Sequence, residues 1–415
     1  MSSAVPASSD LSTDPGAAPR TCIVVGAGIV GAAIAYELQK AGTQVTLVDR
    51  GEPGRGASYG NSGALSSGSV VPLAMPGVLA SVPKMLFDPE SPLHVPPDYF
   101  FTAMPWLLRF VAAARPERVR RIAQSLADLH LGAIDNHLRM ADEIGAPELI
   151  IRRGHLHMYP DAQALAKDAA GWELRRQHGI PFEQLDRAGI LALEPAVGPR
   201  YTVAIHMPDQ ATVLNPLRYV TRIVAAFAQR GGMVARDAIS SLSFANGQWQ
   251  CRGEGRVWTA EQVVIAAGAW SLGLLKSLGL HYPLETQRGY HVTFRGVPAP
   301  ISRSVVLADR KAFLAPMETG LRIGGTVEFG GLEREPDYAR ARLLARFARD
   351  TFAGLAGLDP AQEEVWMGHR PCFPDTLPRI GPAPGHPGLW LAFGHGHLGL
   401  TDSVNTARLL ADIMR

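Results

Sequence analysis

Three glycines and one acidic residue near the start of this 415-residue chain have the spacing of a phosphate-binding turn. Gly26, Gly28 and Gly31 end an apolar run that starts at Thr21, and Asp49 closes a second apolar run about 20 residues later. In such a pattern the first glycine permits a tight turn, the second lets the backbone approach a pyrophosphate, and the third lets a helix pack closely on the strand. The acid accepts hydrogen bonds from a ribose hydroxyl. The spacing therefore predicts a dinucleotide site on a β-α-β unit, in preference to a glycine-rich turn without a ligand.

The residues beside the turn fit the same unit. Ile29 and Val30 would begin the helix, whose unpaired N–H groups and positive dipole end face the phosphates. Arg50 follows the acid and opens the segment RGEPGRGASYGNSGALSSGS, which is too polar for a core and too rich in glycine for a helix. We expect a loop that wraps the cofactor with backbone N–H and hydroxyl donors, the alternative being an ordinary surface loop. The candidate ligands in it are Ser58, Asn61, Ser62, Gly63, Ala64 and Leu65.

Two later strands also run into small residues. A strand over 263–266 leads into Ala267 and Gly268, and a strand over 389–393 leads into a Gly/His turn, residues 394–399, and a closing helix. A second close approach of backbone to a dinucleotide is typical of two-dinucleotide-fold flavoproteins more than of nicotinamide dehydrogenases. The turn at 394–399 again aims helix N–H groups at an electron-rich group.

Composition narrows the class of partner. The chain has 47% hydrophobic and 19% charged residues and a net charge of +2, which is typical of a globular protein and gives no basic footprint for nucleic acid. Its length favours two domains. We therefore expect a small-molecule partner.

Cysteine spacing and the chain start indicate the compartment. Cys22, Cys251 and Cys372 form no CxxC and have no histidine at ligand spacing, so we expect neither a disulfide framework nor a metal site. Residues 1–19 lack an apolar h-region, which predicts a disordered leader rather than a secretory signal. No apolar run reaches the roughly 18 to 20 residues of a spanning helix. A reducing, cytoplasmic location fits these features.

An aromatic stretch, residues 85–121, is broken by prolines and ends in Arg115, Arg118, Arg120 and Arg121. Two interpretations remain open, because such a segment can lie in a lipid interface or pack on its own domain. The first would place the protein peripherally at the inner face of the cell membrane.

The middle of the chain predicts helices and an antiparallel sheet. Apolar spacing indicates one helix over 122–148, and residues 149–159 read as a strand on which His155 and His157 share one face. Without a third ligand, structural roles suit these histidines better than metal binding. Strands such as 290–294 and 321–329 suit a large antiparallel sheet.

In this combination the chain resembles the D-amino acid oxidase/dehydrogenase superfamily of FAD-dependent oxidoreductases, most closely the small-subunit type of bacterial D-amino acid dehydrogenase. The resemblance covers residues 20–415 and rests on an ordered set of motifs: GAGIVGAAIAYELQKAGTQVTLVDR, GNSGALS, VVIAAGAWS, RGYH, RIGGTVEF, GHRPCFPDTLPRIG and GHGHLGLT. It implies an α/β fold with a Rossmann-like, GR2-type FAD-binding domain and a second, antiparallel-sheet α+β substrate domain. The expected FAD domain comprises 20–85, 214–283 and 362–415, and the substrate domain comprises 86–213 and 284–361.

The resemblance also assigns residues to the cofactor. Gly26, Gly28, Gly31 and Asp49 would hold the ADP half of a non-covalent FAD, and Val234 would lie beside it. The loop serines and Asn61 would follow the pyrophosphate and flavin. The isoalloxazine would be bordered by Gly394, His395, Gly396, Leu398, Gly399 and Thr401.

Arg370, in GHRP, matches the arginine that binds the substrate carboxylate in this family, with an ion pair to Asp375 as the alternative. Tyr290 and His291, in RGYH, would lie on the substrate side. The implied reaction moves hydride from Cα to flavin N5 and gives an imine that water hydrolyses to a 2-oxo acid and ammonia. A dedicated base is not required, because an apolar site disfavours the charged ammonium.

The resemblance leaves the substrate and the acceptor open. A D-amino acid with a quinone or another carrier as acceptor comes first. A D-proline or D-hydroxyproline dehydrogenase and a glycine- or sarcosine-type oxidase that uses oxygen are the alternatives. A flavin-binding membrane-surface protein without turnover would not need the GHRP arginine, and a nicotinamide dehydrogenase would not need GHGHLG.

Overall fold

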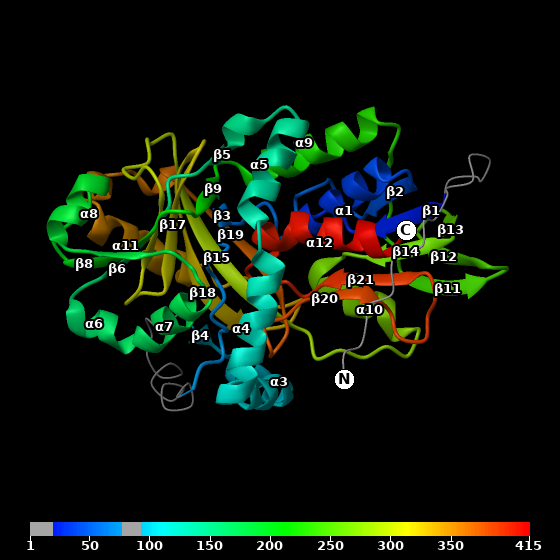
Figure 1. The fold of residues 1–415 in the computed structure, drawn as a ribbon, viewed down its shortest axis with the longest axis horizontal. Coiled ribbons are helices and arrows are strands. Elements are labelled where there is room, and N and C mark those ends of the chain that lie inside the picture. The colour runs from blue at the N-terminus through cyan, green and yellow to red at the C-terminus, as the bar shows by residue number, and fades with distance from the viewer. Residues whose placement is uncertain (1–19, 77–92) are drawn as a thin grey trace, which may run out of the picture.

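The strands of the computed structural model, which describes residues 20–76 and 93–415, form four sheets in two lobes that lie side by side along the long axis (Figure 1). The leader and residues 85–92 of the aromatic stretch lie outside the described residues. One lobe carries a six-stranded sheet and the other carries the largest sheet.

The six-stranded sheet has the order β10-β2-β1-β14-β21-β20. All neighbouring strands are parallel except β20, which runs antiparallel to β21. The β1 strand is buried on both faces, because Cys22 and Val24 join one apolar cluster and Ile23 and Val25 join another. The strands span Thr21–Val25 (β1), Gln44–Asp49 (β2), Met233–Arg236 (β10), Gln262–Ile265 (β14), Arg379–Pro382 (β20) and Leu389–Phe393 (β21).

Helices cover one face of this sheet and a small sheet covers the other. The helices α1 (Ile29–Lys40), α5 (Ala133–Glu143), α9 (Pro216–Gln229) and α12 (Gly399–Ile413) contribute to the first apolar cluster. The strands β11 (Ser241–Ala245), β12 (Gln248–Arg252) and β13 (Val257–Ala260) and the helix α10 (Ser271–Lys276) contribute to the second. This layered arrangement confirms the predicted Rossmann-like fold.

The second lobe is built on a sheet that has nine strands within the described residues, in the order β19-β15-β18-β17-β16-β6-β8-β7, with β4 beside β18. Most pairs are antiparallel, the exceptions being β16 with β6 and β4 with β18. The strands span Leu93–His94 (β4), His155–Tyr159 (β6), Glu183–Leu185 (β7), Val203–Met207 (β8), Glu285–Arg295 (β15), Ser304–Leu307 (β16), Ala312–Met317 (β17), Gly320–Phe329 (β18) and Glu363–Cys372 (β19).

Alternation along β15 separates the two faces of the large sheet. Tyr290, Val292 and Phe294 join an apolar cluster with the helix α11 (Ala339–Thr351). Residues 289, 291 and 293 therefore face the opposite way, toward the first lobe.

The other elements of the described residues lie around these sheets. A small sheet joins β3 (Ala64–Leu65), β9 (Ala211–Val213) and β5 (Ile150–Ile151). The other helices in residues 20–76 and 93–415 are α3 (Phe100–Ala113), α4 (Pro116–His130), α6 (Ala162–Lys167), α7 (Ala169–Gln177) and α8 (Arg187–Leu193), with short 3₁₀ turns at Pro97–Tyr99, Pro147–Leu149, Gly268–Trp270, Ala353–Leu355 and Pro360–Gln362. Of these, α6 and α8 pack against strands of the large sheet (Figure 1).

The structure differs from the sequence-based expectation in four places. Residues 133–143, which we assigned to the substrate domain, form α5 and pack in the apolar cluster on the six-stranded sheet. The single helix expected over 122–148 is interrupted between α4 and α5, where Gly132 has φ +67°. The strand expected over 149–159 is divided into β5 and β6, with Gly154 at φ +77° between them. Residues 363–372, which we assigned to the FAD domain, form β19 of the large sheet, because the chain crosses between the lobes only after Cys372.

Gly31 allows the close packing of α1 on the sheet, and this yields a stability prediction. A Cβ atom at Gly31 would overlap the carbonyl oxygen of Gly26, whereas one at Gly171 in α7 would have its nearest neighbour at 3.5 Å. Gly31→Ala should lower the free energy of unfolding by about 1 to 3 kcal/mol, the usual cost of overpacking. Gly171→Ala, the matched control, should change it by less than about 1 kcal/mol. Urea unfolding with FAD in excess measures both, and equal midpoints for Gly31→Ala and wild type would refute the packing role.

Candidate active site

One cavity of about 1460 Å³ is lined by residues of both lobes. Its wall includes the glycine-rich turn, the loop that follows Asp49, the turn before α12 and the cavity-facing side of β15 and β19. Most predicted cofactor residues line it, namely Gly26, Gly28, Ile29, Val30, Asp49, Arg50, Ser58, Asn61, Ser62, Ala64, Ala267, Gly268, Gly394, His395, Gly396, Leu398, Gly399 and Thr401.

The phosphate end of the cavity is formed by the turn between β1 and α1. Gly26 has φ +109°, and a Cβ atom there would overlap the carbonyl oxygen of Ala266. Gly28 precedes α1 in an extended conformation, and the N–H of Ile29 donates to Oγ of Ser58 at 2.9 Å. A Cβ atom at Gly28 would meet only Ser58 Oγ, at 3.4 Å. Internal packing therefore does not require a glycine at position 28, which leaves the predicted approach of the backbone to a ligand as its role.

Asp49 lies at the end of β2, beside this turn. Its Oδ2 accepts from the N–H of Ala27 at 2.7 Å, and its Oδ1 accepts from the N–H of Gly51 at 2.8 Å. Each carboxylate oxygen keeps a second lone pair, so the group can still accept hydrogen bonds from ribose hydroxyls.

The loop after Asp49 is fixed to the large sheet by a buried arginine. Arg322 in β18 donates to the carbonyl oxygens of Tyr59, at 3.0 Å, and Asn61, at 2.7 Å. Burial lowers the pKa of Arg322 to about 10. His291 in β15 donates from Nδ1 to the carbonyl oxygen of Gly60, at 3.1 Å. The sequence did not single out Arg322, which lies within the RIGGTVEF motif.

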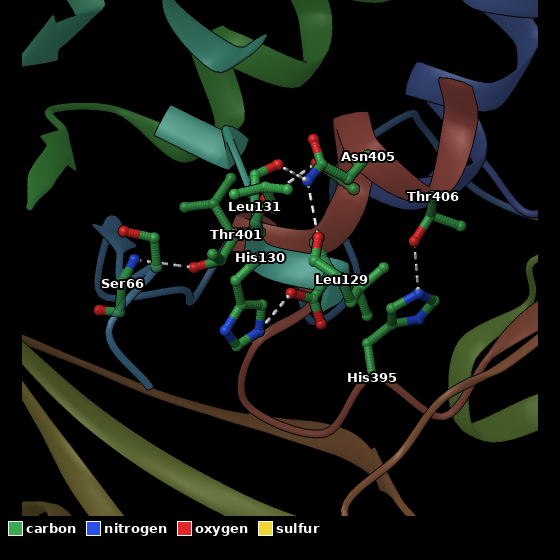
Figure 2. Close-up of polar contacts among 12 residues, drawn as sticks. Ser66, Leu129, His130, Leu131, His395, Thr401, Asn405 and Thr406 are labelled. Carbon is green, nitrogen blue, oxygen red and sulfur yellow. Dashed lines mark hydrogen bonds and ion pairs between the residues drawn. The ribbon is translucent and has the colours of Figure 1, made fainter. Parts of the chain in front are cut away.

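The same loop is also fixed to α12. Thr401 Oγ1 accepts from the N–H of Ser66 at 3.0 Å (Figure 2). It also donates to the carbonyl oxygen of Ala64 at 3.2 Å. Thr401 therefore holds the loop at the N-terminus of α12, where the resemblance placed the flavin.

Four predicted cofactor residues do not line this cavity. Gly31 packs against Gly26, Gly63 lies against the carbonyl oxygen of Val213, and Leu65 is buried in the core. Val234 lines a separate hollow of about 160 Å³. Gly31, Gly63 and Leu65 therefore act through packing. A larger residue at either glycine, or loss of the buried Leu65 side chain, would disturb the loop and the helix that line the cavity.

Arg370 in β19 lies over Gly289 of the neighbouring strand, because a Cβ atom at Gly289 would overlap its guanidinium group. It donates to the carbonyl oxygens of Thr326, at 2.9 Å, and Gly325, at 3.4 Å. No carboxylate of the described residues forms an ion pair with it, and burial lowers its pKa. Asp375 instead pairs with Arg379 at 2.9 Å, so the alternative ion pair does not form.

Tyr290 and His291 point to opposite faces of β15. The Tyr290 hydroxyl donates to Glu328 at 2.6 Å and accepts from the N–H of Asp337 at 2.9 Å, on the face that packs against α11. His291 shares the face of Arg370 and stacks on Trp366, with ring centroids 5.1 Å apart. Burial holds the pKa of His291 well below its usual range. The structure therefore brings His291 to Arg370 and directs the Tyr290 side chain away from it.

The two histidines of the GHGH turn also differ. His395 is buried, and its Nε2 lies 3.1 Å from Oγ1 of Thr406 in α12 (Figure 2). His397, which the sequence did not single out, faces the cavity with an exposed imidazole. The turn is held against β19 by a hydrogen bond of 2.8 Å from the Gly396 N–H to the Pro371 carbonyl oxygen.

A buried histidine–aspartate contact lies at the start of α12. Nε2 of His130, in α4, is 3.0 Å from Oδ1 of Asp402, and both side chains are 1% exposed (Figure 2). This contact joins α4 to the first turn of α12.

The other histidine and cysteine predictions concern packing. His155 Nε2 donates to the Ala211 carbonyl oxygen at 2.8 Å, which is a structural contact. Cys22, Cys251 and Cys372 are buried with free thiols, and burial raises the pKa of Cys372 to about 12. Within residues 20–76 and 93–415, no group of three potential metal ligands is close enough to hold an ion.

These features fit FAD. The turn that leads into α1 contains Gly28, which has no packing role. Asp49 beside it can still accept hydrogen bonds. The backbone of the turn before α12 also lines the cavity. The cavity then continues past that turn to Arg370 and His291, where a substrate carboxylate would lie.

Comparisons with known proteins agree with this geometry. The model of the DAO family, described as FAD dependent oxidoreductase, matches residues 21–413. The chain is 37% identical over 401 residues to a D-amino-acid oxidase of Bradyrhizobium diazoefficiens, covering 95% of each chain. It is 35% identical over 417 residues to D-amino acid dehydrogenase 2 of Ralstonia nicotianae, covering 94% of this chain and 95% of that one. Glycine oxidase from Geobacillus kaustophilus has a similar fold, with a TM-score of 0.71 at 21% identity over 95% and 94% of the two chains.

The open position of Gly28 gives a cofactor prediction. Gly28→Val should fold, because only Ser58 lies near the added Cβ atom, yet its side chain should block the pyrophosphate and give colourless protein. Flavin absorbance of the purified variant measures the loss, and its unfolding midpoint after FAD is removed from both proteins should match that of wild type. A folded Gly28→Val variant with full FAD content would overturn the assigned phosphate site.

Proposed function

The chain belongs to the DAO family of FAD-dependent oxidoreductases, and from this premise we propose that it oxidatively deaminates a D-amino acid. The names of the two relatives support the D-amino acid class of substrate. The observation that carries the proposal is Arg370, a partly buried guanidinium without a carboxylate partner in the described residues, in the wall of the cavity that fits FAD.

Arg370 suits the recognition of a substrate carboxylate. Its planar fork can hold two oxygens at once, which fixes the orientation of Cα as well as the affinity. The Thr326 and Gly325 carbonyl oxygens hold the guanidinium flat over Gly289, so little side-chain freedom is lost when substrate binds. The absence of a carboxylate ion pair within the described residues leaves its charge available to an anion.

The protein then positions the reacting carbon. When bound, FAD accepts the hydride that leaves Cα. The loop fixed by Arg322 and Thr401 and the turn fixed to Pro371 set the distance between the cofactor and Arg370. Water hydrolyses the resulting imine to a 2-oxo acid and ammonia.

The choice of substrate within this class is open to a direct test. D-Proline, D-hydroxyproline, glycine and sarcosine are alternatives to an ordinary D-amino acid. A panel of D-amino acids, their L-enantiomers and these compounds, assayed with an artificial electron acceptor, separates them. Turnover of no D-enantiomer in the panel would refute the proposal.

We infer that the electrons pass to a quinone or a similar carrier rather than to oxygen. The helix α3 carries Phe101, 83% exposed, and Leu108, 63% exposed, seven residues apart on one side. Leu108 also lines the cavity, and Arg109 and Arg115 nearby are exposed. An apolar edge beside exposed arginines suits a surface of anionic lipid that holds quinone. Within the described residues, none of the helices has both the length and the apolar character needed to span a membrane.

Other parts of the same stretch pack on the protein itself. Trp106 is buried and donates from its indole N–H to the Cys372 carbonyl oxygen at 3.1 Å, and it stacks on Phe110 with centroids 5.3 Å apart. The proposed membrane contact is therefore limited to the outer side of α3.

Arg370 gives a kinetic prediction. Arg370→Ala should lower kcat/KM for the substrate by about tenfold to a hundredfold, since a charge-assisted hydrogen bond is worth roughly 1.5 to 3 kcal/mol. Arg370→Lys should show an intermediate defect, because it keeps the charge and loses the fork. FAD content, read from flavin absorbance, should change little in either variant.

Gly289→Ala provides a matched variant that keeps the arginine. The added methyl group occupies the place of the guanidinium, so this variant should also lose activity while the Arg370 charge remains. Normal turnover by Arg370→Ala, or a defect explained wholly by lost flavin, would contradict the proposed substrate pose.

The acceptor gives a separate prediction. In stopped-flow measurements, substrate-reduced enzyme should be reoxidised faster by a quinone analogue than by oxygen at equal concentrations. Phe101→Ser with Leu108→Ser should slow electron transfer to quinone in anionic vesicles and leave turnover with a soluble acceptor unchanged. Fast reaction with oxygen and none with quinone would show an oxidase instead.

A further inference from the structure

His397 is placed at the substrate end of the cavity by the turn between β21 and α12. The Gly396 N–H bonds to the Pro371 carbonyl oxygen, and residues 372 and 395 form a β-bridge, so the turn lies directly against the strand that carries Arg370. Protein surrounds the imidazole, but one side of it borders the cavity. Its exposed surface is therefore cavity surface. No hydrogen bond to a described residue holds its ring nitrogens.

The charges around His397 keep its imidazole neutral. Burial lowers its pKa to about 4, and the Arg370 charge in β19 contributes to the shift. Asp402 in α12 acts in the opposite direction, and His130 in α4 adds to the lowering. At neutral pH the ring therefore has one nitrogen with a free lone pair, which can accept a proton.

His291, Tyr290 and His395 cannot do this. His291 has a neutral ring whose Nδ1 donates to Gly60, while its Nε2 has no partner and is closed to solvent. Tyr290 faces the other side of the sheet, and His395 is bound to Thr406. His397 is the imidazole among these that both faces the cavity and is free of internal bonds.

We propose that His397 accepts the proton of the substrate ammonium group while Arg370 holds the carboxylate. This inference rests on the proposed function. A zwitterionic amino acid presents a carboxylate and an ammonium on the same carbon, so a cation and a neutral base on adjacent segments match its two groups.

The proton balance is simple. One N–H bond of the ammonium breaks, and the proton forms an N–H bond on the imidazole of His397, which becomes a cation. The amine nitrogen keeps the electron pair and uses it for the C=N bond as hydride leaves Cα. The low pKa of the imidazole makes this transfer uphill, and return of the proton from the imidazolium to water in the cavity completes it. The sequence suggested an alternative, in which desolvation alone deprotonates the ammonium group. That alternative needs no proton acceptor beside the substrate nitrogen.

The test compares His397→Gln, which keeps a polar side chain of similar size and cannot take up the proton, with His397→Ala. His281→Asn, at an exposed histidine remote from the cavity lining, is the control. For each protein kcat/KM is measured from pH 5 to 10 with the best D-amino acid of the panel. FAD content and the dissociation constant of propionate, which has a carboxylate and no amine, are measured from flavin absorbance.

Wild-type kcat/KM should be nearly constant from pH 5 up to the pKa of the substrate ammonium, since His397 stays neutral above about pH 4. His397→Gln should lose about a hundredfold at pH 7, within the usual range for general base catalysis. Its kcat/KM should rise about tenfold per pH unit and approach the wild-type value once the substrate amine is deprotonated. Added imidazole should partly restore His397→Ala, and FAD content and propionate binding should stay at the wild-type level.

Three results would overturn the inference. They are wild-type kcat/KM in His397→Gln at pH 7, a defect of equal size at every pH, and a defect that follows lost FAD or weaker propionate binding. If wild type oxidises none of the D-amino acids, the proposed function fails and the inference fails with it. An active wild type with an unaffected His397→Gln variant overturns the inference alone.

Discussion

The burial of the Arg322 guanidinium between the two lobes is the interaction on which the site depends. Its partners at the cofactor loop are the neutral carbonyl oxygens of Tyr59 and Asn61. A buried cation without an acid is costly unless each N–H finds an acceptor, and a loop that moved away would leave the charge unsatisfied. The loop and the β18 strand therefore behave as one body. His291, bonded to Gly60 between those two carbonyl groups, is positioned by the same contact.

Around this junction, successive side chains of a strand point to opposite faces of the sheet. One residue therefore packs in the core while its neighbour faces the cavity. On β15, Tyr290 stabilises the contact with α11 while His291 faces the cavity. The GHGH turn shows a similar division, since His395 bonds to Thr406 and His397 faces the cavity. Adjacent residues thus have different roles, because each side chain contacts a different neighbouring element.

The local parts of this structure could be predicted from the sequence, and the long-range parts could not. The turn from Gly26 to Gly31 and the helix α9, which begins at Pro216 after the capping Asn215, follow from residues close in the chain. For the large sheet, the sequence predicted the antiparallel class but not the pairing of the strands. The register of β19 on β15 joins residues about 80 positions apart. Which of His395 and His397 is left free of internal hydrogen bonds depends on Thr406 and Pro371, and no spacing rule in the turn itself reveals that.

The electrostatics of the substrate end explain why it would combine an arginine with neutral imidazoles. Arg322 is buried and Arg370 partly buried, both without an ion-paired carboxylate among the described residues, and the N-terminus of α12 adds a positive dipole end. Asp402 is close to His397, but its carboxylate already contacts His130 at 3.0 Å. In this positive field a substrate carboxylate is stabilised and an ammonium group beside it is not. The field that recognises the anion therefore also favours loss of the ammonium proton, which is the condition for the electron pair of nitrogen to assist removal of hydride from Cα.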